Sequence, residues 1–212
     1  MGDNMSSDLL INFYTKENPK KYEKILKNYK KEINEKLPNI YTGLGIRTTI
    51  EGTIVENIFG EEYYIVGVLT DYSKYCSYFY EDEYPIEKAK QIAKQNTQIL
   101  IDTVKKVIEL IQPEFGFGGI HNTIEEYEIK LEKKKYKNPK EFLSDITDNF
   151  TKLPWLFVYK EDLDIKIPEK VIWDETDILT EPQLIEKIGK CYLYILNTNS
   201  VAPEVEEDDD WI

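Results

Sequence analysis

The sequence predicts an α+β fold, in which an antiparallel sheet is covered on one face by amphipathic helices. Two observations carry this prediction. Segments rich in β-branched and aromatic residues follow one another with short connections between residues 40 and 80, which favours antiparallel neighbours. A stripe of apolar residues at helical spacing then runs through residues 85–112, and a helix of that length can lie across a whole sheet.

The first elements are expected in the order strand, helix, sheet. Residues 8–14 form the first strand. Asn18 and Pro19 supply an N-cap and a first-turn proline for an amphipathic helix over residues 19–36. Three strands are then expected, from the β-branched residues 48–55, the apolar run 63–69 and the aromatic run 75–80.

The long helix expected over residues 85–112 begins at Pro85 and is stopped by Pro113. Each buried Leu or Ile side chain contributes roughly 1.5–3 kcal/mol to stability. Loss of the stripe should therefore collapse the domain. Its members are Ile86, Ala89, Ile92, Ala93, Leu100, Val104, Val107, Ile108 and Ile111.

The second half of the chain is expected to alternate short helices and strands. In order, we expect a glycine turn at residues 115–119, a strand at 123–131, a helix starting at Asn138-Pro139, a strand at 153–159, a helix from a Thr180–Gln183 capping box to Gly189, and a core strand at 191–196.

The chain of 212 residues carries a net charge of −13. Its length fits one large domain or two small ones, and we assign one domain to residues 1–202. Residues 203–212 are too acidic to pack and are expected to form a flexible acidic tail. From residue 161 onward the chain has 15 acids and 4 lysines. Such an end repels nucleic acid and attracts basic protein partners.

Cysteine usage and the start of the chain point to the cytoplasm. Cys76 and Cys191 lie far apart in sequence and sit among aromatic residues, so we expect two buried thiols in a reducing compartment. The first 15 residues carry acids where a signal peptide needs bases, and no apolar run is long enough to span a membrane.

Histidine and arginine are scarce: the chain has one of each, His121 and Arg47, against 40 acids and 16 tyrosines. Histidine is the usual general base and metal ligand near neutral pH, and arginine is the usual clamp for phosphate. Most familiar active sites cannot be assembled from this composition. We therefore expect a non-enzymatic protein with no catalytic residue, no metal site and no cofactor.

The strongest alternative places chemistry beside the glycine turn. The glycines at 116, 118 and 119 follow a helix rather than a strand, which is the wrong context for a phosphate loop. His121 comes directly after them, and Glu125, Glu126 and Glu128 could orient its ring. A carboxylate- and tyrosine-based hydrolase is the alternative function. A structural or regulatory protein of a mobile element is another.

The densest cluster of tyrosine and acid is the candidate partner-binding surface. Rigid aromatic side chains anchor protein interfaces, and acids steer a basic partner. Trp173, in the acidic end of the chain, is added as a second contact. The residues of the cluster are Tyr72, Tyr75, Tyr78, Tyr80, Glu81, Asp82, Glu83 and Tyr84.

Residues 98–196 share a layout with a known class of proteins. A long helix ends in Ile111-Gln112-Pro113, the aromatic-glycine pair Phe115-Gly116 follows, Pro154-Trp155 precedes an aromatic strand, and a last strand runs from Gly189 to Ile195. This layout resembles the immunity proteins of bacterial polymorphic and contact-dependent toxin systems. The resemblance covers under half of the chain and carries no functional residue with it.

The resemblance implies a small acidic protein that binds and blocks a cognate toxin without catalysis. The leading hypothesis is therefore a cytoplasmic, acidic binding protein, an immunity protein or inhibitor, which occludes a basic toxin domain. We expect neither a nucleic acid nor a membrane among its partners, and the oligomeric state is left open.

Overall fold

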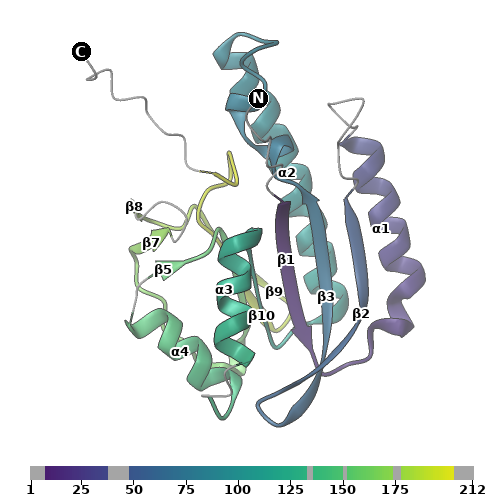
Figure 1. Ribbon diagram of the computed structural model, residues 1–212, viewed down its shortest axis with the longest axis vertical. Helices are drawn as coiled ribbons and strands as arrows, with labels where there is room; N and C mark the ends of the chain where they lie inside the picture. Colours follow the sequence, from purple (N-terminus) through teal and green to yellow (C-terminus); the bar gives the residue numbers. More distant parts are fainter. Residues whose placement is uncertain (1–7, 38–47, 133–135, 150–151, 174–177, 203–212) are drawn as a thin grey trace.

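Seven strands form one antiparallel sheet, which draws on both halves of the chain (Figure 1). The computed structural model describes residues 8–37, 48–132, 136–149, 152–173 and 178–202. In order across the sheet, the strands are β2 (Thr49–Ile58), β3 (Glu61–Asp71), β1 (Asp8–Thr15), β4 (Phe115–Ile120), β6 (Leu156–Lys160), β10 (Cys191–Ile195) and β9 (Leu184–Ile188).

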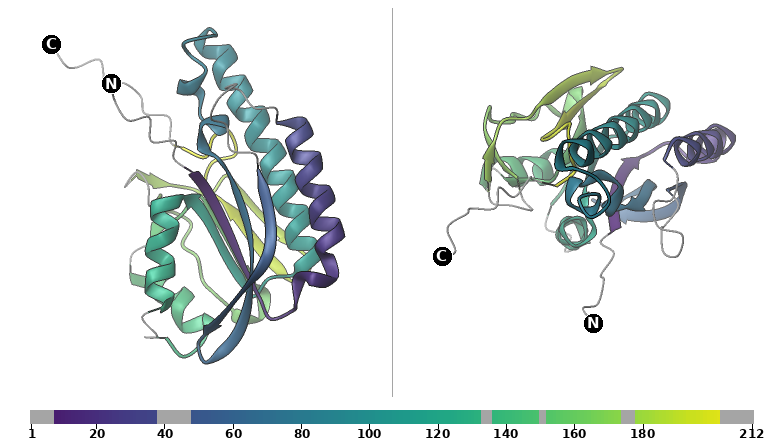
Figure 2. Two further views of the ribbon diagram at one scale, coloured as in Figure 1. Left: turned by 45° about the vertical axis from the view of Figure 1, so that its right-hand side comes forward. Right: turned by 90° about the horizontal axis from the view of Figure 1, so that it is seen from above.

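Helices lie on both faces of this sheet. Figure 2 shows α1 and α2 on one face and α3 with α4 on the other. A second sheet of three short strands lies on the same side as α3 and α4. The bounds are α1 (Glu23–Lys36), α2 (Ile86–Ile111), α3 (His121–Glu132), α4 (Pro139–Asn149), β5 (Lys152–Leu153), β7 (Val171–Trp173) and β8 (Ile178–Thr180).

Four 3-10 turns connect these elements: η1 (Pro19–Tyr22), η2 (Tyr72–Tyr75), η3 (Ser77–Phe79) and η4 (Glu161–Leu163). The expected α+β fold, with an antiparallel sheet and one long helix, is confirmed. We expected helices on one face of the sheet; α1 and α2 cover one face, and α3 and α4 cover part of the other. Residues 203–212, the expected acidic tail, lie outside the described residues.

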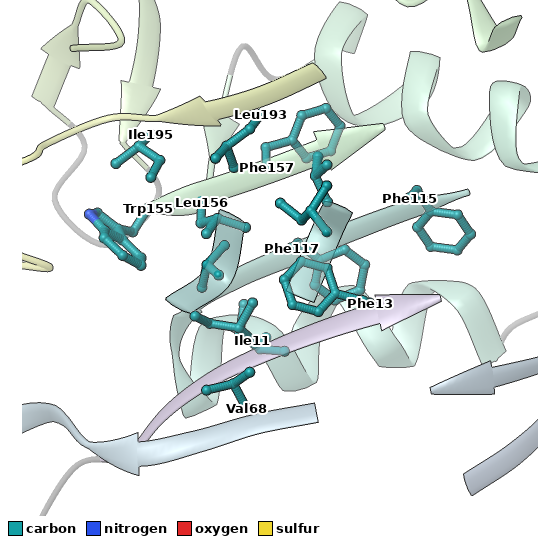
Figure 3. Packing of buried hydrophobic residues seen from close by; sticks show 14 of the residues in the cluster. Ile11, Phe13, Val68, Phe115, Phe117, Trp155, Leu156, Phe157, Leu193 and Ile195 are labelled. Atoms are coloured by element: carbon teal, nitrogen blue, oxygen red, sulfur yellow. The ribbon is translucent and has the colours of Figure 1, made fainter. Parts of the chain in front are cut away.

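The long helix α2 forms one side of the core. Most of its stripe is buried as expected, with Leu100, Val104 and Val107 fully enclosed, whereas Ile86 in the first turn is 57 % exposed and Ile92 is half-buried. Figure 3 shows the apolar side chains of β1 and β3 with which this core is built, among them Ile11, Phe13 and Val68. Capping chemistry also acts as expected, because Asn18 accepts a hydrogen bond of 2.9 Å from the backbone N–H of Lys20. Similarly, Asn138 accepts one of 2.9 Å from the N–H of Glu141 at the start of α4.

The expected glycine turn at residues 115–119 is wrong, because these residues form strand β4 in the middle of the sheet. A Cβ on Gly118 would lie 2.6 Å from Cγ1 of Ile11, and one on Gly116 would lie 2.8 Å from the ring of Phe13. Glycine is needed here because the large side chains of β1 lean across the neighbouring strand. The repeat of glycine is therefore a packing device of the sheet.

Three further expectations are wrong. The expected strand at 123–131 is helix α3, whose buried residues Ile124, Tyr127 and Leu131 recur at helical spacing. The aromatic run 75–80 forms the turns η2 and η3, because the Asp71 carboxylate accepts a 3.0 Å hydrogen bond from the N–H of Ser73 and starts a turn.

The third concerns the expected helix that ends at Gly189, where the chain forms strand β9 and a tight turn. Gln183 does not act in a capping box with Thr180. Its side-chain oxygen accepts hydrogen bonds from the backbone N–H and the hydroxyl of Thr198, at 2.8 and 2.9 Å. All five residues of β9 pair with β10 in an antiparallel hairpin, from Leu184 opposite Ile195 to Ile188 opposite Cys191.

None of the helices in the described ranges has both the length and the apolar character that a membrane span requires.

Candidate functional site

The structure divides the predicted tyrosine and acid cluster into a buried part and an exposed part. Tyr72, Tyr75 and Tyr80 are at most 6 % exposed, so they contribute to the core and not to a surface. Tyr78 is 52 % exposed. Tyr84 is half-buried, with the Lys88 ammonium 4.1 Å from its ring centre, and the three acids between Tyr80 and Tyr84 are exposed.

The buried tyrosine hydroxyls have structural partners. Tyr75 Oη lies 2.9 Å from Oγ1 of Thr70, which in turn lies 2.9 Å from Oγ1 of Thr48. Tyr80 donates to the backbone carbonyl of Lys74 at 3.0 Å. Trp173 belongs to β7 in the small sheet and is 4 % exposed. The side chains of Tyr72, Tyr75, Tyr80 and Trp173 are therefore not available to a partner protein in this conformation.

The alternative centre at His121 has an open geometry. His121 begins α3, its side chain is 41 % exposed, and its Nε2 lies 3.3 Å from Oε1 of Glu125 one turn later. The two free thiols, Cys76 and Cys191, are buried, and burial raises the pKa of each to about 12. Within the described ranges, no group of three or more His, Cys, Asp or Glu side chains is placed to hold a metal ion.

A site that the sequence did not reveal lies on the sheet face that α3 flanks. Figure 1 shows α3 over the middle of the sheet, whereas none of the described helices covers β3 and β2 on that side. This part of the face forms an open groove with a volume of about 350 Å³, which we call the acidic groove. Its lining residues are Leu10, Asn12, Thr49, Glu51, Ile54, Glu56, Ile65, Gly67, Leu69 and Glu128.

A β-bulge in β2 brings two of the groove carboxylates to the same side. Glu51 and Glu56 are five positions apart in sequence, so a regular strand would point them to opposite faces. The register shifts between Gly52 and Ile54, which inserts one extra residue into β2. Glu51 then lies opposite Gly67 and Ile54 opposite Ile65. Gly67 and Ile65 share one face of β3, so Glu51 and Ile54 share one face of β2. Glu56, two positions after Ile54, lies on that same face.

The third carboxylate, Glu128, comes from α3 and is held over the sheet. Its Oε1 accepts a 2.6 Å hydrogen bond from the side-chain amide of Asn12 and lies 3.4 Å from the hydroxyl of Tyr14. Asn12 is itself buried. The helical spacing of α3 places His121, Glu125 and Glu132 on the same side of the helix as Glu128.

Burial raises the pKa values of two groove carboxyls. For Glu56 the main cause is desolvation, and the charges of Glu128 and Glu132 add to it. For Glu128 desolvation also dominates, and it outweighs the opposing hydrogen bonds from Asn12 and Tyr14. The groove therefore combines an apolar floor with carboxylates that are incompletely solvated, and no lysine or arginine is among its lining residues.

The groove was hidden from sequence reasoning for two reasons. Glu56 and Glu128 belong to different halves of the chain, and only the fold brings them together. The local signals were nevertheless present. Gly52 inside a β-branched run is typical of a bulge. Once residues 121–132 are recognised as a helix, the spacing of Glu125, Glu128 and Glu132 predicts an acidic helix face.

Comparisons with protein-family models, with curated proteins and with solved structures found no match.

Proposed function

We propose that the chain is a non-enzymatic binding protein, of the inhibitor or immunity type, which takes up a lysine- or arginine-bearing segment of a basic protein partner in the acidic groove. Its action is occlusion of the partner's surface. We place it in the cytoplasm, where the free thiols Cys76 and Cys191 remain reduced. A toxin domain is the partner class that the layout of the second half favours.

The observation that carries this proposal is the state of Glu128. A carboxylate that has lost part of its water is in an unfavourable state unless a cation or hydrogen-bond donors compensate. Asn12 supplies one strong donor, but the pKa of Glu128 is still raised, so the compensation is incomplete. An ammonium or guanidinium group that enters the groove would complete it.

Charge also favours a basic partner at long range. The net charge of −13 attracts a cationic protein before contact and speeds its association, and this effect weakens as salt is added. The apolar groove residues Leu10, Ile54 and Leu69 provide the contact area that charge alone lacks. The exposed side chains around Tyr78 remain a candidate for a second contact.

The test is affinity capture from native cells with the wild-type chain, a groove variant and a matched control. The groove variant is Glu56→Gln with Glu128→Gln. The control is Glu35→Gln with Glu87→Gln, which removes two charges from exposed helix positions. We expect a basic protein that the wild type and the control retain and the groove variant loses. Equal retention by all three would contradict the proposal.

One observation favours the alternative of a carboxylate-based hydrolase. Glu56 and Glu128 line one groove and both have raised pKa values, and carboxyl pairs of this kind perform acid–base work in glycosidases. His121 is on the same side of α3. Hydrolysis of an oligosaccharide or ester panel by the wild type, with loss of activity in Glu128→Gln and in His121→Ala, would establish this alternative.

A further inference from the structure

Strand β2 lies at the end of the sheet, with β3 on its inner side. In the described part of the chain no strand pairs with its outer side. It is ten residues long, and it carries two apolar side chains that are well exposed, Ile54 at 58 % and Val55 at 46 %. Proteins normally protect such edges, because a row of free backbone donors and acceptors can recruit another strand.

The residue just before β2 shows how its outer side can be satisfied. The amide of Asn34, on α1, donates to the carbonyl oxygen of Thr48 at 2.7 Å, and its oxygen accepts from the N–H of Thr48 at 3.0 Å. One side chain thus bonds both backbone groups of one residue, as an added β-strand would. These bonds also show that the backbone groups of Thr48 point outward.

The outward-pointing groups of β2 follow from this orientation. In an antiparallel ladder, alternate residues direct their backbone groups to the same neighbour, so Ile50 and Gly52 also point outward. The bulge shifts the alternation to Val55 and Asn57. Strand β1 gives the same assignment. The carbonyl of Tyr14 accepts a 2.8 Å hydrogen bond from the N–H of Glu114 and therefore points toward β4. When this alternation is followed through the β1–β3 and β3–β2 pairings, Ile50 and Gly52 again point away from the sheet.

Hollows flank β2 on both faces. On one side lies the acidic groove, with Glu51 and Glu56. On the other side, between β2 and α1, lies a second hollow of about 380 Å³. Its floor contains Leu26 and Ile50. Its rim mixes lysine and glutamate and includes Glu51, whose Oε1 lies 3.4 Å from Nζ of Lys30 on α1 in an exposed ion pair that an incoming cation would have to displace. A strand added beside β2 would send alternate side chains toward these two different environments.

We infer that β2 is the docking edge for an extended segment of the basic partner, which adds as an eighth strand and directs a lysine or arginine at every second position toward Glu51 and Glu56. The side chains between them are apolar and lie on the α1 side, over Leu26 and Ile50. This inference rests on the proposed function and specifies the conformation and sequence pattern of the segment that is bound.

A second copy of the chain fits this edge poorly. Antiparallel pairing of two β2 strands about a two-fold axis through the bulge would bring Glu51 of one copy toward Glu56 of the other on the same face. Like charges directly opposite each other in a ladder are destabilising. The carboxylates therefore select a segment of opposite charge over self-association.

The test uses a short synthetic peptide that alternates lysine with valine, titrated into the full chain by calorimetry. Its companion has the same sequence but is N-methylated at every backbone amide, so that it keeps all charges and offers β2 no N–H donor from either edge. We expect the N-methylated peptide to bind about tenfold or more weakly, the effect of losing two or more hydrogen bonds. Equal affinity for both peptides, or binding of neither, would overturn strand addition.

Amide exchange measured by NMR gives an independent readout. The outward N–H groups of Ile50, Gly52, Val55 and Asn57 should become protected when the alternating peptide binds. Protection elsewhere but not at these four amides would contradict the inference. Such a result, with binding that still depends on Glu56 and Glu128, would leave the groove function intact. Binding that ignores both carboxylates would count against the proposed function itself.

A variant of the chain completes the test. Val55→Pro removes one outward donor and should leave the β2–β3 ladder in place, because edge strands tolerate proline where the N–H faces away from the sheet. Val55→Thr is the matched control. We expect the proline variant alone to lose affinity for the alternating peptide, by severalfold. Unchanged affinity in a folded proline variant would refute the inference, and the N-methylated peptide decides the matter if that variant does not fold.

Discussion

The side-chain nitrogen of Asn12 lies 2.6 Å from Oε1 of Glu128, so a buried amide in β1 fixes a carboxylate of α3 above the sheet. The amide favours the charged form of Glu128, whereas burial favours the neutral form and has the larger effect. A fixed, poorly solvated carboxylate is preorganised to bind a cation without rearrangement. The contact with Asn12 therefore lowers the entropic cost of binding at this site.

Replacement of Glu128 by Gln should increase the free energy of unfolding at pH 7. The pKa of Glu128 in the folded chain lies above its ordinary value of 4.5. The protonated carboxyl therefore stabilises the folded state fully below pH 4.5, and this stabilisation is lost as the pH rises through the folded pKa. At pH 7 the folded chain carries a desolvated charge, and Gln removes it. Because the site is only half-buried, solvent screening limits the gain to about 0.5 kcal/mol.

Urea denaturation of wild type and Glu128→Gln at pH 7 and at pH 4 measures this effect. The gain should be present at pH 7 and absent at pH 4. Glu87→Gln, at an exposed position on α2, corrects for the loss of one negative charge. A variant that is less stable than wild type at pH 7 would mean that the bond from Asn12 outweighs desolvation.

The two thiols should be unreactive in the folded protein. Cys76 and Cys191 are at most 1 % exposed, and desolvation raises the pKa of each to about 12, so almost no thiolate exists at pH 8. Ellman's reagent should detect less than about a tenth of one thiol in the native chain and both thiols in urea. Rapid reaction of either cysteine without urea would contradict their burial.

Sequence patterns correctly predicted the elements whose local residues are compatible with one type of secondary structure only. Asn18-Pro19 and Asn138-Pro139 mark helix starts, and the long stripe of α2 allows no strand. Residues 123–131 satisfied two periods, since Tyr127, Ile129 and Leu131 alternate as in a strand whereas Ile124, Tyr127 and Leu131 recur as in a helix. The exposure of Ile129, 49 %, shows that the helical period is the true one.

The acidic groove depended on information that no local pattern contains. The face to which Glu56 points is set by a bulge, and the height of Glu128 above the sheet is set by packing of α3 on β4 and β1. The predicted tyrosine cluster failed for a related reason, because composition cannot separate Tyr75, which is fully buried, from Tyr78, which is half exposed.

Tyr75 and Tyr78 should respond to mutation in opposite ways. Tyr75→Phe removes a hydroxyl that bonds Thr70 inside the core, so it should lower the free energy of unfolding by about 1 kcal/mol. Tyr78→Ser changes a side chain that is 52 % exposed and should alter stability by less than about 0.5 kcal/mol. Thermal denaturation of both variants measures the difference.

The same pair tests the second contact. If the exposed side of the tyrosine cluster touches the partner, Tyr78→Ser weakens capture of that partner and Tyr75→Phe does not, at a temperature where both remain folded. Full retention by Tyr78→Ser would restrict the partner interface to the groove and the β2 edge.

Gly118→Ala should destabilise the sheet through one specific collision. The new Cβ would lie 2.6 Å from Cγ1 of Ile11, so the side chain of Ile11 or the backbone of β4 must shift, at a cost of about 1–3 kcal/mol. Ile11→Ala by itself leaves a cavity beside β4 and should cost about 2–5 kcal/mol. The double variant lets the alanine at position 118 occupy the space that Ile11 vacates, so its cost should be smaller than the two single costs added together. Urea denaturation of the four chains gives this coupling energy, and strictly additive costs would show that Ile11 is not the reason for glycine at position 118.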